Sequence, residues 1–317
     1  MHLLIPFAAA DAEGCAAQRR GLRLPHLERL LARLAPDSPD TGDEFSLSPP
    51  HERALAALLG IDGGGDGRIP WAAQAVAAEG GDPGADAWAT ITPCHWRVAP
   101  DHIAMLDPQQ LGLGEDESRA LLALMAPYFL EDGIALDYVS PTAWRARGEP
   151  LRGLATASLD RVQGRSLDLW MPDAPAARLV RRLQGEMQML LYTHPMTDAR
   201  AEQGRLAVNA FWVSGTGERP ATARTEVPGL QLPQGLRQAA LQEDWAGWAA
   251  AWQAIDAAEV RQALEAAEAG RPVALTLCGE RNAQRFEARP RGSWQRLSQG
   301  ISGVLGRKPA LFAGLQL

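Results

Sequence analysis

Short apolar runs alternate with amphipathic stretches along most of this 317-residue chain. Residues 3–7 and 134–139 are apolar runs too short for helices, and they predict strands buried in a sheet. Leucines recur at three- and four-residue spacing in 24–34, and 115–131 opens on acidic residues, so both segments predict helices. A long helix is expected to begin at Arg178. This alternation predicts an α/β protein whose largely parallel central sheet is flanked by helices.

The stretch 144–170 breaks this alternation, because it reads as strand and loop and carries several arginines. A discontinuous core with an insertion is expected. The first part of the α/β core is expected in 1–90 and the second part in 171–317. An inserted α+β subdomain is expected between them, in 91–170.

The composition is that of an ordinary soluble globular protein, with 46% hydrophobic and 22% charged residues. A net charge of −7 argues against nucleic acid or an anionic membrane as a partner, because such binding needs clustered positive charge. The three cysteines lie far apart and indicate neither a disulfide framework nor a zinc knuckle. The apolar start lacks the basic region of a signal peptide, and no later charge-free run is long enough to span a bilayer. These features predict a cytoplasmic protein.

Arginines are the main candidates for ligand recognition, because Lys308 is the single lysine of the chain. This bias either reflects the base composition of the gene or serves bidentate recognition of carboxylates and phosphates. Arginines gather in and just before the segment 178–217, together with other polar residues. A cleft there would bind a phosphorylated or carboxylate metabolite, and the alternative is a solvated helix face paired with Glu186 and Glu202. The candidate ligand contacts are Arg161, Arg165, His194, Asp198, Arg200 and Asn209.

Metal-binding and catalytic patterns are weaker. The chain contains no H-x-H or H-E-x-x-H pattern and no G-x-S-x-G elbow, so no catalytic residue is assigned and no metal or cofactor is expected. Four residues would approach one another if the chain turns at 99–100, although structural roles for them are favoured. These weak metal candidates are Cys94, His95, Asp101 and His102.

Two other features have structural explanations. The glycine-rich loop 63–67 lacks the Lys-Ser/Thr of a phosphate-binding loop and predicts a flexible surface turn. Trp245, Trp248 and Trp252 have i, i+3, i+7 spacing and so share one helix face. We expect this face to pack on the sheet rather than to form a ligand cage.

Two segments of the chain resemble a known family. Residues 189–200 (MLLYTHPMTDAR) and 208–217 (VNAFWVSGTG) are similar to the pattern L-x-x-H-P-V-N-x-x-R … N-x-[IV]-W-x-x-G-x-G. This pattern is found in archaeal-type cofactor-independent phosphoglycerate mutases of the alkaline phosphatase superfamily. Residues 24–30 look like the helix start T-P-N-L-D-R-L of that superfamily. The whole chain, including 160–168, resembles a proteobacterial offshoot, the RpfE-type regulatory or phosphoglycerate-mutase-like proteins. The resemblance implies an alkaline-phosphatase-like fold.

The catalytic members of that superfamily use two divalent metals, held by Asp and His residues, and a Ser or Thr nucleophile. Their first metal-binding Asp follows the first strand, where 7–10 reads Phe-Ala-Ala-Ala in this chain. Their late Asp-x-x-Gly-His segment is absent, and no histidine follows His194. At the corresponding place the chain reads Asp-Trp-Ala-Gly-Trp over 244–248, although Asp256 is present. Without such ligands a two-metal clamp cannot assemble in the manner of those enzymes.

The resemblance and its departures together predict a non-catalytic, phosphoglycerate-mutase-like protein that is regulatory or binds a small anion. Two alternatives stay open. One is an active metal-dependent phosphomutase or phosphatase with a rearranged site, which as an enzyme would be a phosphoglycerate-mutase-like isomerase. The other is a pure protein-interaction module that binds a protein partner and no small ligand.

Overall fold

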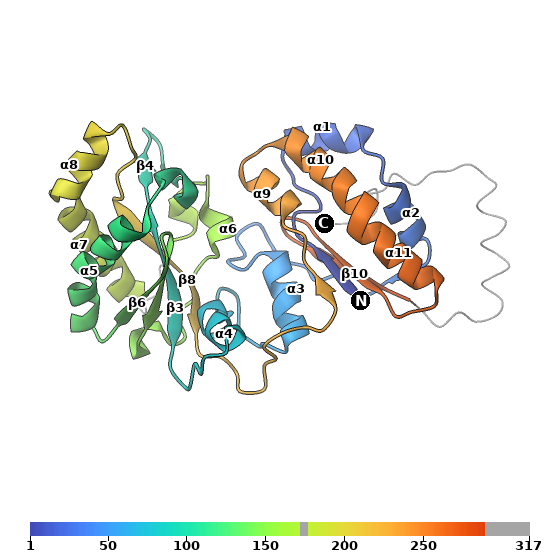
Figure 1. Ribbon diagram of the computed structural model, residues 1–317, viewed down its shortest axis with the longest axis horizontal. Coiled ribbons are helices and arrows are strands. Elements are labelled where there is room, and N and C mark those ends of the chain that lie inside the picture. The colour runs from blue at the N-terminus through green and yellow to red at the C-terminus, as the bar shows by residue number, and fades with distance from the viewer. Residues whose placement is uncertain (172–176, 289–317) are drawn as a thin grey trace. The chain divides into compact units, whose positions relative to one another are not determined.

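A computed structural model describes residues 1–171 and 177–288 of the protein (Figure 1). The chain divides into two compact units. Unit 1 combines residues 1–44 with the part of the chain that begins at Val227, and unit 2 comprises Phe45–Glu226. Within the described ranges, no helix combines the length and the apolar character needed to cross a bilayer.

Unit 2 contains the whole of the expected subdomain 91–170 and extends beyond it at both ends. Strand β3 (Trp88–Cys94), which crosses the first expected boundary, pairs with β8 (Ala210–Gly217), which lies beyond the second. Helix α4 (Trp71–Ala78) packs its alanines against Trp88 of β3. Both expected boundaries therefore fall inside unit 2. Local spacing could not locate the limits of this unit, because they depend on strand pairing between distant segments.

The sheet of unit 1 is mixed, with the strand order β2-β11-β10-β1-β9. Strand β1 is parallel to β9 and β10, whereas β11 is antiparallel to β10 and β2. Only residues 279–282 separate β10 from β11, which is too short for the crossover that a parallel pair requires. The α/β class is confirmed, while the parallel part of the sheet is confined to β9, β1 and β10. The strands are β1 (His2–Ile5), β2 (Ala35–Pro36), β9 (Leu230–Gln231), β10 (Ala274–Cys278) and β11 (Ala283–Glu287).

Among the described residues of unit 1, the helices that flank this sheet are α1 (Glu13–Gly21), α2 (Pro25–Leu31), α9 (Gly235–Leu241), α10 (Trp245–Ile255) and α11 (Arg261–Glu268). A π-helical turn at Asp256–Val260 joins α10 to α11. Trp248 and Trp252 are fully buried in one core with Leu275 and Leu277 of β10. The expectation that this tryptophan face packs on the sheet is therefore confirmed for these two indoles.

Asp256 lies in the π-helical turn and anchors the start of α2. Its carboxylate accepts hydrogen bonds from the backbone N–H of Leu27 (2.8 Å) and lies 2.9 Å from Nδ1 of His26. The carboxylate is almost fully buried, so these bonds replace its lost hydration. The segment that resembles the superfamily's helix start is thus held by a residue more than 200 positions later in the chain.

Unit 2 is built on an antiparallel sheet with the order β6-β7-β3-β8, in which β6 is Ala135–Ser140 and β7 is Ala143–Arg147. Helices α5 (Glu115–Glu131) and α7 (Arg178–Tyr192) cover one face of this sheet (Figure 1). Phe129 of α5 meets Phe211 of β8 there, with ring centroids 5.1 Å apart. Trp212 points to the opposite face and packs with Cys94 in a second core, as the period of two along a strand requires.

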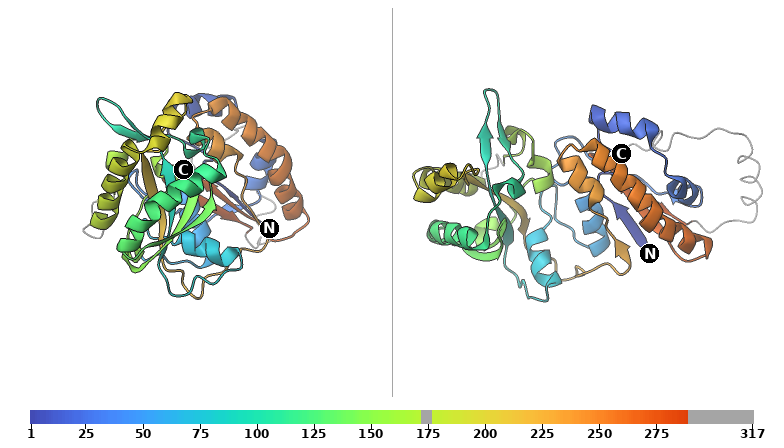
Figure 2. Two further views of the ribbon diagram at one scale, coloured as in Figure 1. Left: turned by 60° about the vertical axis from the view of Figure 1, so that its left-hand side comes forward. Right: turned by 45° about the horizontal axis from the view of Figure 1, so that its top comes forward.

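The remaining elements of unit 2 are short. Strands β4 (Trp96–Val98) and β5 (Ile103–Met105) form a hairpin, which Figure 2 shows extending beyond the sheet of unit 2. The other elements are α3 (Pro50–Leu59), α6 (Leu159–Val162), α8 (Pro195–Glu202), and the 3₁₀ turns η1 (Pro108–Leu111), η2 (Glu149–Leu151) and η3 (Leu167–Leu169).

The glycine-rich loop is not merely a surface turn. Gly67 is buried at φ 72°, a conformation that favours glycine, and its carbonyl accepts a hydrogen bond from the backbone N–H of Thr156 (2.9 Å). Asp66 accepts hydrogen bonds from the backbone N–H groups of Leu47 and Ser48. The loop therefore fixes the segment before α3 and the segment before α6.

Candidate anion-binding site

Arg200, one of the expected ligand contacts, is bonded to the protein through all three nitrogens of its guanidinium group. It is 3% exposed, and its Nε donates to the carbonyl oxygen of Leu206 (2.6 Å). Its two terminal nitrogens donate to Glu117 of α5 and to the carbonyl oxygen of Leu111. The guanidinium group thus ties α8 to the start of α5, and these protein bonds occupy it.

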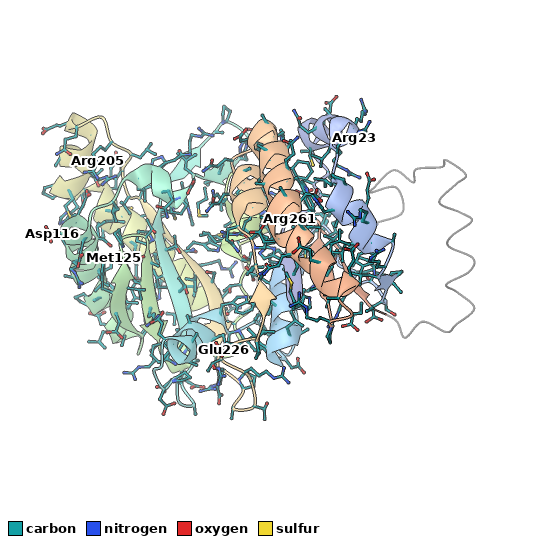
Figure 3. All side chains as sticks on the ribbon, turned by 45° about the vertical axis from the view of Figure 1, so that its right-hand side comes forward. Arg23, Asp116, Met125, Arg205, Glu226 and Arg261 are labelled. Carbon is teal, nitrogen blue, oxygen red and sulfur yellow. The ribbon has the colours of Figure 1, made fainter. Side chains whose placement is uncertain are left out.

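Glu117 completes this ion-pair network, because its second oxygen accepts from Arg205, labelled in Figure 3, at 2.9 Å. Burial acts to raise the pKa of Glu117, but hydrogen bonds and charges from Arg200 and Arg205 outweigh it and lower the pKa overall. The carboxylate therefore stays ionised between two guanidinium groups. This network joins α5, α8 and the loop before β8.

His194 and Asp198 lie at the start of α8. His194 is the N-cap residue, and its Nδ1 accepts a hydrogen bond from the backbone N–H of Met196 (3.2 Å). The ring is half-buried. Asp198 is exposed in the first turn of the helix, where a negative charge is favoured by the helix dipole. Both residues thus have local roles in starting α8, and His194 also keeps part of its ring at the surface.

Asn209 binds the backbone of the hairpin strand β4. Its Oδ1 accepts from the N–H of Trp96 (2.7 Å), and its Nδ2 donates to the carbonyl oxygen of Trp96 (2.9 Å). The side-chain amide therefore takes the place of a neighbouring strand at this residue. Both polar ends of Asn209 are occupied by these bonds.

Arg161 and Arg165 lie in and just after the short helix α6. Arg161 is 3% exposed, and its guanidinium carbon is 5.8 Å from the ring centroid of Trp170. Arg165 is half-buried. The two arginines lie next to the core that contains Trp170 and Trp212, whereas Arg200 lies beside the opposite core under α5. The structure thus divides the expected set into two groups.

The four weak metal candidates do not form a cluster. Cys94 is fully buried at the end of β3, and burial raises the pKa of its thiol far above the usual value. Nδ1 of His95 lies 2.8 Å from the carbonyl oxygen of Ala207 at the base of the hairpin. Asp101 and His102 pair at 2.7 Å at its tip. Within 1–171 and 177–288, no group of three or more His, Cys, Asp or Glu side chains is placed to hold a metal ion.

The end of strand β1 is closed by apolar residues. Residues 7–10 are all buried, and Phe7 has a φ of 51°, which is rare for a bulky side chain. The indole nitrogens of Trp248 and Trp252 donate to the carbonyl oxygens of Phe7 (2.8 Å) and Ala8 (3.2 Å). In open α/β sheets, ligands bind at the carboxyl ends of the parallel strands. In unit 1, two indoles and three alanines occupy this place beside β1.

A buried polar cluster in unit 2 was not expected from the sequence. His51 and Glu52 open α3, and Ser158 and Asp160 lie at the start of α6. Nε2 of His51 is 3.2 Å from Oδ2 of Asp160. Glu52 accepts hydrogen bonds from the Ser158 hydroxyl and from the indole nitrogen of Trp71 (2.9 Å). Burial raises the pKa of Glu52, although the neighbouring His51 and the Ser158 hydrogen bond act to lower it.

The sequence offers little that identifies this cluster. The His-Glu pair follows Ser-Pro-Pro and reads as an ordinary helix start. Helix α3 has Pro49 as its N-cap, and the hydroxyl of Ser48 instead accepts from the N–H of Gly67 (2.9 Å). The one available cue is the pattern Ser-x-Asp-Arg at 158–161, whose polar residues are all buried.

Comparisons with known proteins find similarity to solved structures, including the following two. No protein-family model matches the chain, and no curated protein matches it. The cofactor-independent phosphoglycerate mutase from Thermoplasma acidophilum is similar at 13% identity and a TM-score of 0.37, covering 90% of this chain and 89% of its own. The PH0037 protein from Pyrococcus horikoshii is similar at 13% identity and a TM-score of 0.43, covering 90% and 87%. Similarities at this level identify no residue of a site.

Proposed function

We propose that this protein is a non-catalytic, phosphoglycerate-mutase-like α/β protein with a regulatory role, and that it binds a small phosphorylated or carboxylate metabolite. The observation that carries the proposal is the closed end of β1. A metal-binding carboxylate would be needed there for the chemistry of the resembled enzymes, and the chain places Phe7 and buried alanines at that point. Trp248 and Trp252 fill the adjoining space from α10.

Arg165 is the residue we favour for contact with the anion. Arg200 and Asn209 are bonded to the protein itself, which supports a structural role for both. Arg165 is half-buried and follows the buried Arg161 by four residues, just after the end of α6, so an anion near them would be partly desolvated and could meet a guanidinium group. His194 stays in the proposal as a second, separate contact.

The first test asks whether the protein has metal-dependent activity. Purified protein is analysed for Mn, Mg and Zn, and assayed for 3-phosphoglycerate mutase and general phosphatase activity. We expect substoichiometric metal and no turnover above a blank. Stoichiometric metal together with turnover would overturn the non-catalytic proposal.

The second test asks whether an anion binds. Thermal unfolding is measured with 3-phosphoglycerate, inorganic phosphate and a panel of carboxylates. We expect at least one of them to raise the midpoint in the wild type and in Arg119→Ala, a control that removes an exposed arginine of α5. Arg165→Ala should lose the shift. If no compound raises the unfolding midpoint of any of these proteins, the proposal of anion binding fails. The protein-interaction module then becomes the better explanation.

One observation favours a rearranged catalytic site as the second candidate. The Ser158 hydroxyl donates to Glu52, which is the arrangement of a nucleophile beside a base. Ser158 is only 8% exposed, however, so a substrate would reach it only after a rearrangement. Phosphatase activity that disappears in Ser158→Ala but persists in Ser166→Ala would establish this candidate.

A further inference from the structure

The outward face of α7 carries an unusual pattern of side chains. Its exposed positions follow one another at four- and three-residue steps, which is the spacing of a coiled-coil seam. Met189 and Tyr192 on this face are 70% and 79% exposed. The opposite face is buried through Val180, Leu183, Met187 and Leu191. We call the exposed positions the α7 stripe; they are Arg178, Arg182, Gly185, Met189 and Tyr192.

Gly185 at the middle of the α7 stripe has no explanation within the chain. A Cβ added there would meet no atom within 4 Å. Glycine inside a helix costs about 1 kcal/mol relative to alanine, so an exposed helix centre has no local reason to use it. A missing side chain does allow a second helix to approach closely at that point.

We propose that the α7 stripe is a dimer interface, in which α7 of one protomer packs antiparallel against α7 of a second copy with the two Gly185 residues at the two-fold axis. Such an interface is isologous: Gly185 meets Gly185 of the partner at the axis, and each of the other residues of the stripe meets a different member of the same stripe. The antiparallel arrangement places Arg178 of each protomer opposite Tyr192 of its partner. Met189 of each protomer then faces the aliphatic stem of the partner's Arg182.

Charge decides the direction of the two helices. The stripe is basic in its first half, with Arg178 and Arg182, and apolar in its second half. A parallel pair would place arginine on arginine and leave the methionines and tyrosines to pair among themselves. The antiparallel pair places the guanidinium group of each Arg178 over the partner's tyrosine ring and opposes the two helix dipoles. Complementarity between the two halves therefore favours a second copy of this chain as the occupant.

Arg182 is already positioned for this contact. Its guanidinium group pairs with Glu186 at 2.9 Å, one turn further along α7, and with Asp132 after α5. These bonds hold its stem along the helix surface, where it can cover the partner's Met189. Helix α7 has 15 residues and is therefore about 22 Å long, so the seam is short. We expect a reversible dimer of moderate affinity rather than an obligate one.

Sedimentation velocity over a concentration series, from low micromolar to several hundred micromolar, tests the association. The wild type should dimerise, and Met189→Glu and Tyr192→Glu should each weaken the dimer at least about tenfold, which corresponds to about 1.4 kcal/mol. The matched control is Leu130→Glu, which adds the same charge at a residue of α5 that is 66% exposed and lies outside the stripe. A wild type that is monomeric throughout, or a dimer that the stripe variants leave unchanged, would overturn the proposal.

Cysteine cross-linking tests the geometry. Cys15, Cys94 and Cys278 are buried, so a cysteine placed on the stripe provides an accessible thiol, and the native thiols should contribute little cross-linking. Under mild oxidation, Gly185→Cys should form a covalent dimer alone. Arg178→Cys and Tyr192→Cys should form one only when the two variants are mixed. Self-cross-linking of Arg178→Cys and of Tyr192→Cys would indicate parallel helices and would refute the antiparallel arrangement.

Discussion

The indole nitrogen of Trp248 donates a hydrogen bond of 2.8 Å to the carbonyl oxygen of Phe7, which joins α10 to the turn that ends β1. Both residues are buried, and Phe7 has a positive φ. If the buried Phe7 carbonyl lost this donor, it would lose a bond that replaces the hydration it gave up on folding. The bond therefore helps to hold the backbone of the turn in a conformation that a bulky residue rarely adopts.

We expect Trp248→Phe to destabilise the protein by about 1–3 kcal/mol, because the aromatic packing is largely kept while the Phe7 carbonyl loses its donor. Trp248→Ala should cost about 3–5 kcal/mol, since it also leaves a cavity. Chemical denaturation measures both values. Trp245→Phe on the same helix, at a partly buried position, should cost less than either. A Trp248→Phe variant as stable as the wild type would show that the hydrogen bond contributes nothing.

Replacement of Arg200 tests whether this residue is structural. We expect Arg200→Ala to cost about 3–5 kcal/mol, because the carbonyl oxygens of Leu111 and Leu206 would lose their donor and the partly buried Glu117 would keep only Arg205. Arg200→Lys should recover little, since one ammonium group cannot reach the three acceptors that the guanidinium fork bonds. Urea denaturation gives the comparison with Arg119→Ala, whose exposed ion pair should be worth less than about 1 kcal/mol. Equal stability of Arg200→Ala and the wild type would contradict this role.

The bonds of Asn209 to Trp96 predict a local effect on the β4–β5 hairpin. Asn209→Ala removes both bonds, so the amide of Trp96 should exchange its hydrogen faster and the protein should lose about 1–3 kcal/mol. Asn209→Asp keeps the acceptor for the Trp96 amide but not the donor to its carbonyl, so it should be intermediate in stability. Hydrogen exchange followed by mass spectrometry or NMR makes the measurement. Unchanged protection of the hairpin in Asn209→Ala would refute this explanation.

His2 predicts a dependence of stability on pH. Burial lowers the pKa of His2 from 6.5 to about 4, with a smaller contribution from Arg285, and the ring lies 2.8 Å from the Thr276 hydroxyl. Between about pH 6.5 and pH 4, the unfolded chain binds a proton at His2 that the folded protein does not. The contribution of His2 to the free energy of unfolding should therefore fall as the pH falls through this range, and it should be constant above it. His2 alone should lower the free energy of unfolding by on the order of 3 kcal/mol across this range.

The pH effect is measured as a difference between two proteins. His2→Gln should remove this part of the loss, so its stability relative to the wild type should rise as the pH falls from about 6.5 to about 4. Acidic side chains titrate in the lower part of the same range, and the subtraction cancels their contribution. A constant difference between the two proteins across this range would contradict a lowered pKa.

Periodicity along the chain was sufficient to predict many of the local elements. Helix α5 coincides with the expected 115–131, and α7 begins at the expected Arg178. The spacing of Trp248 and Trp252 also indicated their common buried face. These features depend on neighbours within one or two turns, so the sequence contains the relevant information locally.

The role of each polar side chain was decided by segments far away in the chain. Arg200 pairs with Glu117, and Asn209 with the backbone of Trp96, across more than 80 residues. Spacing places such residues on an element, but it does not show whether they face a ligand or another part of the protein. The extent of the insertion has the same origin, because it depends on the pairing of β3 with β8.

The sequence by itself determined the α/β class, most of the helices and strands, and the absence of an acidic residue directly after the first strand. The tertiary structure decided what fills that place, namely the indoles of Trp248 and Trp252, and it assigned Arg200 and Asn209 to bonds within the protein. The physical reason is that burial and hydrogen-bond partners depend on contacts between distant segments. Local patterns set only the elements on which those contacts are made.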